Sequence, residues 1–346
     1  MAYTTIDDPS AYFQTQLYTG DASTQDITNS GNSDLQPDWI WIKNRDAESN
    51  HIAQDTSRGI NICSFPDENA DEQTNSNFGH VNSVTSDGFQ VDEGNSGEAN
   101  ANKNTEKYVA WQWKANAGTT SSNSTGDITS TVQVSSTAGF SIVTYTATAT
   151  AGDTVGHGLS SQPDMIMVKK RAGGDDYGWG VWHTGLSNNN GTKQLILDTT
   201  AAEATQDMFN DAIFPSGSAT VFATGQNNHT NFPSGATYVA YCFNPVQGYS
   251  KFGSFIGNNH DAGSEQSDGT FIYTGFKPAW LLFKRTDSTS NWCLVDSKRL
   301  GYNPDIPEFR PNLNNAEGNT TDDILDLVSN GFKIRTTSGN FGGGTG

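Results

Sequence analysis

The segment Pro37-Asp-Trp-Ile-Trp-Ile-Lys-Asn-Arg45 is a run of aromatic and β-branched residues that begins with proline and ends with charge. Related segments are Pro163-Asp-Met-Ile-Met-Val-Lys-Lys-Arg171 and Pro278-Ala-Trp-Leu-Leu-Phe-Lys-Arg285. The first apolar residues of these segments are 126 residues apart (39 to 165) and 115 residues apart (165 to 280). Such intervals are typical of small domains and exceed the repeat length of a solenoid. The sequence therefore predicts one unit used three times.

The composition predicts β structure in each of these units. The chain has 36 glycines, 11% aromatic residues and only 16% charged residues, a mixture that favours strands and tight turns. Short apolar runs separated by polar turns are typical of an antiparallel sandwich. We therefore predict an all-β fold of three tandem antiparallel β-sandwich repeats. Two windows, 200–209 and 321–329, have a helix-like pattern and are expected to form one short helix or turn each.

Composition shifts along the chain give the domain boundaries. Residues 116–137 are almost entirely small and polar, apart from Val132 and Val134, which is typical of a linker. The predicted division is an N-terminal arm (1–11), repeat 1 (12–117), a Ser/Thr/Gly-rich linker (118–138), repeat 2 (139–247) and an incomplete repeat 3 (248–346).

The closing strand distinguishes the third repeat from the other two. Tyr108-Val-Ala-Trp-Gln-Trp113 and Tyr238-Val-Ala-Tyr-Cys-Phe243 align without a gap and alternate as half-buried strands do. In repeat 3 only Gly342-Gly-Gly-Thr-Gly346 stands where this strand would begin. Two explanations stay open: the protein continues beyond the sequence, or a partner's strand completes an open sheet edge.

Charge, cysteines and hydropathy limit the classes of function. The net charge of −19 argues against nucleic acid or an anionic membrane as the main partner. The three cysteines (Cys63, Cys242 and Cys293) fall in three different repeats, so a disulfide framework is not expected. The N-terminus lacks the features of a signal peptide, and no apolar run approaches the ~18 residues of a membrane span. We expect the chain to be made in a cytoplasm without membrane insertion.

The paired tryptophans Trp39/Trp41 and Trp111/Trp113 could form a sugar-stacking platform or a core. Because residues i and i+2 of a strand share one face, each pair points to one side of its strand. Their counterparts in the other repeats are large and apolar but not always aromatic, which favours the core interpretation.

A lysine follows the signature strand in every repeat, at positions 43, 169 and 284. The acid at the end of the next strand, Asp55 or Asp296, is a candidate partner. His183 replaces that acid in repeat 2, so a structural or surface ion pair is expected rather than a shared catalytic pair.

The sequence predicts no catalytic residue, no cofactor and no metal site. None of the six histidines has a metal-ligand spacing, and no EF-hand, phosphate loop or nucleophile elbow occurs. The Asp- and Asn-rich loops leave calcium binding open.

One loop is a candidate binding site. Residues 173–180 place Asp175, Asp176, Tyr177 and Trp179 among four glycines, whereas the matching loops of the other repeats have no aromatic residue. Flexible glycines beside aromatic residues are typical of contact loops. Alternatively, Trp179 begins the next strand, as Trp292 does in repeat 3.

Several phrases together resemble repeat domains of unknown function found in virion and tail-fibre-like proteins of marine tailed phages. They lie at 1–13, 157–159, 163–169, 238–243, 248–255, 273–280 and 326–336, and thus cover nearly the whole chain. Copies in that family usually finish with a strand like Tyr-Ile-Tyr-x-Ala-Phe after Gly-Gly-Thr, so 343–346 looks like a copy that stops just before it. The resemblance implies a structural protein on the exterior of a phage particle, with no catalytic motif to transfer.

We therefore expect a non-enzymatic phage virion protein, such as a tail fibre, tail or capsid appendage, that serves host attachment or particle assembly. Its expected partners are other virion proteins and itself, as a symmetric oligomer such as a trimer. The alternative is a lectin-like module that binds host surface glycan. A glycan-degrading enzyme is the third hypothesis, but it needs two carboxylates about 5–10 Å apart in a cleft, and the sequence indicates no such pair.

Overall fold

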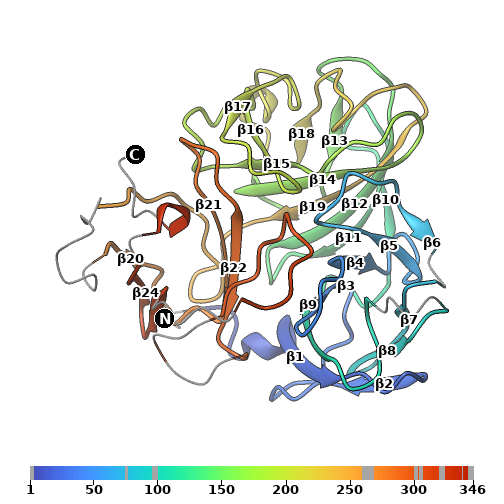
Figure 1. Cartoon of the computed structure of the whole chain (residues 1–346). Coiled ribbons are helices and arrows are strands. Elements are labelled where there is room, and N and C mark those ends of the chain that lie inside the picture. The colour runs from blue at the N-terminus through green and yellow to red at the C-terminus, as the bar shows by residue number, and fades with distance from the viewer. Residues whose placement is uncertain are drawn as a thin grey trace.

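The computed structural model describes residues 4–74, 77–95, 100–258, 269–299, 303, 307–318, 324–336 and 338–341. In this part of the chain the only helices are the short 3-10 turns η1 (Pro9–Ala11), η2 (Pro215–Gly217) and η3 (Gly339–Phe341). The other elements are strands, and every named strand pairing is antiparallel. The all-β prediction is confirmed. Figure 1 shows three neighbouring groups of strands, with β1–β9 at lower right, β10–β19 at the top and β20–β24 at left.

The N-terminal segment (residues 12–117) forms a six-stranded sheet and a smaller three-stranded one. The larger sheet has the order β1 (Phe13–Thr19), β9 (Lys107–Trp113), β3 (Trp39–Asn44), β4 (Ile52–Asp55), β5 (Ile62–Ser64) and β6 (Gln73–Thr74). The smaller sheet has the order β2 (Gln25–Thr28), β8 (Gly88–Asp92) and β7 (His80–Thr85).

The middle segment (residues 118–247) forms an eight-stranded sheet and the pair β13 (Thr154–Gly156) and β18 (Val221–Ala223). The sheet has the order β10 (Ser121–Asn123), β11 (Ser130–Ser135), β12 (Phe140–Thr146), β19 (Thr237–Phe243), β14 (Met165–Ala172), β15 (Gly180–His183), β16 (Lys193–Ile196) and β17 (Ala204–Thr205).

The predicted linker is therefore part of this sheet. β10 pairs with β11, and β11 pairs with β12 through residues such as Val132 and Val134. Val132 is buried and Val134 is half-buried, so these two valines give the mainly polar β11 its apolar contact with the rest of the protein.

The C-terminal segment (residues 248–346) forms two small sheets. β21 (Trp280–Lys284) pairs with β22 (Trp292–Asp296), and the second sheet has the order β20 (Phe271–Tyr273), β24 (Gly331–Ile334) and β23 (Leu325–Val328). The two helix-like windows contain β17 and β23 in place of helices. Residues 321–323 of the second window, and the glycine-rich 342–346, lie outside the described residues.

The sheets of the first two segments share a register. Phe13, Trp113, Trp39 and Asp55 are opposite one another across four strands, as are Phe140, Phe243, Met165 and His183. In the C-terminal segment, Trp280 is opposite Asp296 in the same way. The closing strand, β9 or β19, lies between the first strand (β1 or β12) and the signature strand (β3 or β14) in both of these sheets.

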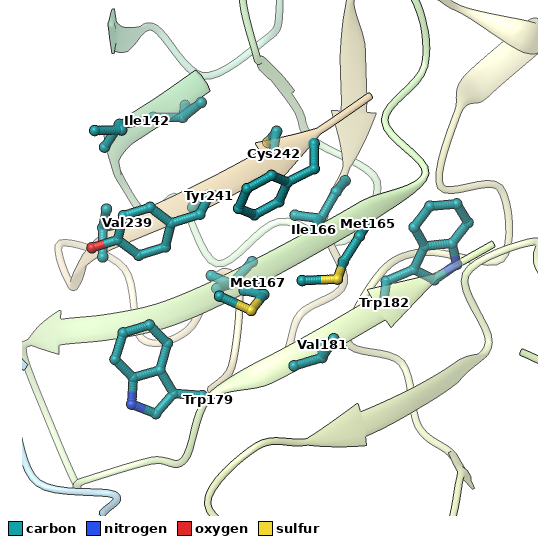
Figure 2. Close-up of a cluster of buried hydrophobic side chains, with 14 of the residues drawn as sticks. Ile142, Met165, Ile166, Met167, Trp179, Val181, Trp182, Val239, Tyr241 and Cys242 are labelled. Carbon is teal, nitrogen blue, oxygen red and sulfur yellow. The ribbon is translucent and has the colours of Figure 1, made fainter. Parts of the chain in front are cut away.

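One large core joins all three segments. Trp39 stacks on Tyr241 with ring centroids 4.5 Å apart, and Trp113 meets Trp280 edge-on at 5.4 Å. Figure 2 shows the middle part of this core, where Met165, Met167 and Tyr241 lie over Trp179 and Val181. The core interpretation of Trp39, Trp41, Trp111 and Trp113 is confirmed, since none is more than 8% exposed. Aromatic faces from separate segments thus fill one shared interior.

Candidate functional site

A cavity of about 970 Å³ lies beside β21. The chain 251–257 and β21 both line it, and the shared core contributes to its wall through Trp39, Trp113, Met165 and Phe243. This volume is at the upper end of the ~300–1,000 Å³ that small-ligand pockets occupy. The cavity is mostly apolar, with His183 as a polar group on its wall.

The strand that borders this cavity is less buried than its counterparts. All six residues of β3 are buried, and so are the first six of β14, whereas all five residues of β21 are half-buried. β3 and β14 each have two neighbouring strands, but β21 pairs only with β22 in the described part of the chain. The exposure of β21 therefore follows from its open edge.

The predicted binding loop is a different region, and the structure divides its four residues. Asp175 and Asp176 are exposed and Tyr177 is half-buried, but Trp179 is fully buried. The Trp179 Nε1–H donates to the Phe65 carbonyl at 2.8 Å, and the indole stacks on Tyr241 in the core. Trp179 immediately precedes β15, in agreement with the alternative that it begins the next strand. A ligand on the surface could contact only the other three.

Two lysines support this loop from beneath. Lys169 Nζ donates to the Tyr177 carbonyl at 2.6 Å and to the Asn69 carbonyl at 2.8 Å, while Lys170 Nζ donates to the Asp175 carbonyl at 2.7 Å. The Lys170 ammonium also lies 5.3 Å from the centre of the Tyr177 ring, within range of a cation–π contact. Burial lowers the pKa of Lys169 to about 8. These contacts order the loop backbone, while the side chains of Asp175 and Asp176 remain exposed.

The predicted ion pairs between signature lysines and strand-end acids are wrong. Lys43 is fully buried and donates to the Asn44 carbonyl at 2.8 Å, and burial lowers its pKa to about 8. Asp55 instead binds Arg58 at 2.5 Å, and Asp296 binds Arg299 at 2.6 Å. The two residues of each pair are three positions apart, and their side chains are fully buried. The acid therefore binds the arginine of the turn that follows its own strand.

Each of these acids also receives a hydrogen bond from the closing strand of another segment. Tyr241 Oη donates to Asp55 Oδ2 at 2.7 Å, and Trp111 Nε1–H donates to Asp296 Oδ2 at 3.1 Å. Tyr241 and Trp111 occupy the same place in β19 and β9. The gapless alignment of the two closing strands shows that Trp111 and Tyr241 are equivalent. It does not show which acid each of them contacts.

The described residues contain no group of three or more His, Cys, Asp or Glu side chains placed to hold a metal ion. Burial raises the pKa of Cys63 and of Cys242 to about 12, so neither thiol is a ready nucleophile at neutral pH. The buried lysines and the two buried Asp–Arg pairs described above are satisfied by structural contacts.

The chain belongs to the family described as "Domain of unknown function (DUF7483)", whose model matches residues 8–346. No curated protein and no solved structure matches the chain. Among the described residues, no helix is both long and apolar enough to cross a membrane.

Proposed function

We propose that this chain is a non-enzymatic structural protein on the exterior of a tailed-phage particle, where it serves host attachment or particle assembly. In this proposal its architecture is three tandem β-sandwich repeats whose signature strands are β3, β14 and β21. Its partners are other virion proteins and further copies of itself, as a symmetric oligomer.

The observation that carries the proposal is the use of equivalent residues for structural contacts. Asp55–Arg58 in the N-terminal segment and Asp296–Arg299 in the C-terminal segment are the same buried pair in the same register. Both acids are bound to an aromatic residue of another segment. These acidic and basic residues are here used to join sheets, and satisfied buried networks of this kind make a core rigid, which favours a structural scaffold.

The test is to locate the protein on purified phage particles. Mass spectrometry of particles should detect its peptides at a fixed copy number, and antibody labelling should mark an external appendage in electron micrographs. Peptides found only in the lysate, with particles free of them, would contradict the proposal.

A second candidate, glycan binding, is favoured by the surface loop of the middle segment. Asp175 and Asp176 are exposed carboxylates beside the half-buried ring of Tyr177, and ligand sites commonly combine aromatic side chains with a few polar or charged groups. A glycan array should show binding that is lost in Tyr177→Ala and kept in Thr131→Ala, an exposed change on β11. The absence of binding to every glycan by a folded chain would eliminate this candidate.

A further inference from the structure

The three segments contact one another in a closed cycle, and the same backbone hydrogen bond occurs at each of the three joints. The donor is the N–H of a glutamate, and the acceptor is the carbonyl two residues after the signature lysine of another segment. The three bonds are Glu72 to Arg171 (3.1 Å), Glu203 to Thr286 (2.8 Å) and Glu317 to Arg45 (2.9 Å). The N-terminal segment thus binds the middle one, the middle segment binds the C-terminal one, and the C-terminal segment binds the N-terminal one.

A buried indole makes the same hydrogen bond at two of these joints. Trp179 Nε1–H donates to the Phe65 carbonyl at 2.8 Å, and Trp292 Nε1–H donates to the Ile196 carbonyl at 2.9 Å. Each accepting residue precedes the glutamate of its joint by seven positions (65 to 72 and 196 to 203). The joint between the N-terminal and middle segments therefore matches the joint between the middle and C-terminal segments in these donors, acceptors and spacings.

The glutamate is held between two arginines at two of the joints. Glu72 accepts two hydrogen bonds from Arg171 of the middle segment, at 2.8 and 2.9 Å, and lies 3.3 Å from Arg58 of its own segment. The same arrangement at the joint between the C-terminal and N-terminal segments consists of Glu317, Arg45 and Arg299, with ion pairs of 2.8 and 3.0 Å. We call Arg45 and Arg171, which cross a joint, the latch arginines. Charge-assisted bonds of this kind are roughly twice as strong as bonds between neutral groups.

Glu203, at the joint between the middle and C-terminal segments, has neither arginine. Thr286 occupies the place of the latch arginines, and Leu186 occupies the place of the arginine that follows the strand-end acid in the other two segments. The Glu203 carboxylate instead accepts hydrogen bonds from the N–H and the hydroxyl of Ser187, which belongs to its own segment. In the described chain Glu203 therefore binds the C-terminal segment through its backbone N–H and not through its side chain.

The signature lysine shows the same difference between joints. Lys169 Nζ donates to the Asn69 carbonyl of the N-terminal segment at 2.8 Å, whereas the equivalent Lys284 Nζ lies 3.4 Å from the Thr200 carbonyl of the middle segment. The neighbouring Arg285 pairs within its own loop and does not replace a latch arginine. The charged contacts across this joint are thus longer than their counterparts or absent from the described chain.

We propose that the protein opens at the joint between the middle and C-terminal segments. The C-terminal segment separates there from the middle segment, while the latch arginines keep the other two joints closed. Local opening occurs where the least free energy holds two parts together, and this joint lacks both charge-assisted pairs of its glutamate. The comparison uses only positions that the joints share, and it does not depend on the proposed function.

Hydrogen exchange of the 346-residue chain, followed by NMR, tests the proposal directly because the three glutamate amides make the same hydrogen bond. After correction for the intrinsic exchange rate at each position, the Glu203 amide should exchange at least about tenfold faster than the amides of Glu72 and Glu317. The indole N–H of Trp292 should likewise exchange at least about tenfold faster than that of Trp179. Equal exchange rates within either set would overturn the proposal.

Removal of a latch arginine should loosen a closed joint. Arg171→Gln removes the charge that crosses to Glu72 and should speed the exchange of the Glu72 amide and the Trp179 indole at least about fivefold. Lys103→Gln is the matched control, because it removes an ion pair of 2.6 Å inside the N-terminal segment, and it should leave both rates unchanged. Unchanged rates in Arg171→Gln would show that the latch arginine does not hold the joint, and would overturn the proposal.

The opposite substitution should close the third joint. Thr286→Arg places a cation opposite Glu203 and should slow the exchange of the Glu203 amide and the Trp292 indole at least about fivefold. The slowing should be absent in Thr286→Gln and lost when Glu203→Gln is added. Slowing that survives the loss of the Glu203 charge, or no slowing in a folded Thr286→Arg chain, would overturn the proposal. If Thr286→Arg fails to fold, the Arg171→Gln result and the exchange rates of the unmodified chain still decide the question.

Discussion

β3 and β21 have the same sequence pattern but different surroundings. β3 lies between β9 and β4 and is buried at every position, while β21 has β22 on one edge, a cavity on the other, and no buried residue. The residues that differ between the two strands are all apolar, so their hydrophobicity does not explain the contrast. A strand of this kind becomes buried through its neighbours, and its own sequence only makes burial favourable.

The largest expected difference between the two strands is the loss of stability when their equivalent tryptophans are replaced by alanine. Trp39→Ala should lower the free energy of unfolding by about 4 kcal/mol, because it removes a fully packed ring from the shared core. Trp280→Ala should cost only about 1–2 kcal/mol, because its ring already borders the cavity. Urea denaturation followed by circular dichroism measures both. Equal losses would show that β21 is as closely packed as β3.

The next test concerns the buried pair after β4. Arg58→Ala should cost about 3–5 kcal/mol, because it leaves the Asp55 carboxylate buried with the Tyr241 hydroxyl as its side-chain partner. The double variant Arg58→Ala/Asp55→Asn should recover part of that loss, since it removes the unpaired charge. A double variant less stable than Arg58→Ala would show that the cost is packing and not charge. The middle segment has neutral His183 and Leu186 at the same two places.

The pH dependence of stability should report this neutral site. Burial lowers the pKa of His183 to about 4, below the ordinary value of 6.5. The unfolded chain therefore binds a proton that the folded chain does not, and His183 lowers stability as the pH falls from 6.5 to 4. With allowance for the partial exposure of the His183 ring, the loss in the free energy of unfolding is about 2 kcal/mol.

The matching variant isolates that contribution. Between pH 6.5 and 4, the free energy of unfolding of the His183→Gln variant should fall by about 2 kcal/mol less than that of the unmodified chain. Urea denaturation at each pH measures both. Identical pH profiles would mean that His183 is solvated.

The smallest effects are expected from substitutions in β12 and in the segment 251–257. Val143→Thr buries a hydroxyl inside β12 and should cost about 1–2 kcal/mol. Ile256→Thr changes a side chain that is 79% exposed, so it should alter stability by less than about 0.5 kcal/mol. Thermal unfolding measures the pair. A loss from Ile256→Thr as large as that from Val143→Thr would indicate that 251–257 is covered in solution.

Local pattern was sufficient to predict the closing strands and the signature strands. The alternation in β9 and β19, and the apolar runs of β3, β14 and β21, lie where the sequence placed them. The prediction failed where local pattern was weak or ambiguous. β10 and β11 are mainly polar and depend on pairing with β12, and the 200–209 window contains β17, which pairs with β16. Pairing partners distant in sequence decided both.

The candidate sites show the same division. The residues around Trp179 have the composition of a contact loop. Trp179 is nevertheless buried, because Phe65 and Tyr241, from two other parts of the chain, contact its ring. The cavity beside β21 is not visible in the sequence, because its wall combines residues from all three segments.

The sequence by itself determined the β class, the three related strands and the side chains that form the core, because alternation along a strand is a local property of successive residues. The tertiary structure decided that one core joins all three segments, that Tyr241 binds Asp55 and Trp111 binds Asp296, and that β21 borders a cavity. These features depend on which sheet faces which. The two hydrogen bonds join residues 186 and 185 positions apart, and no short stretch of sequence specifies such a pairing.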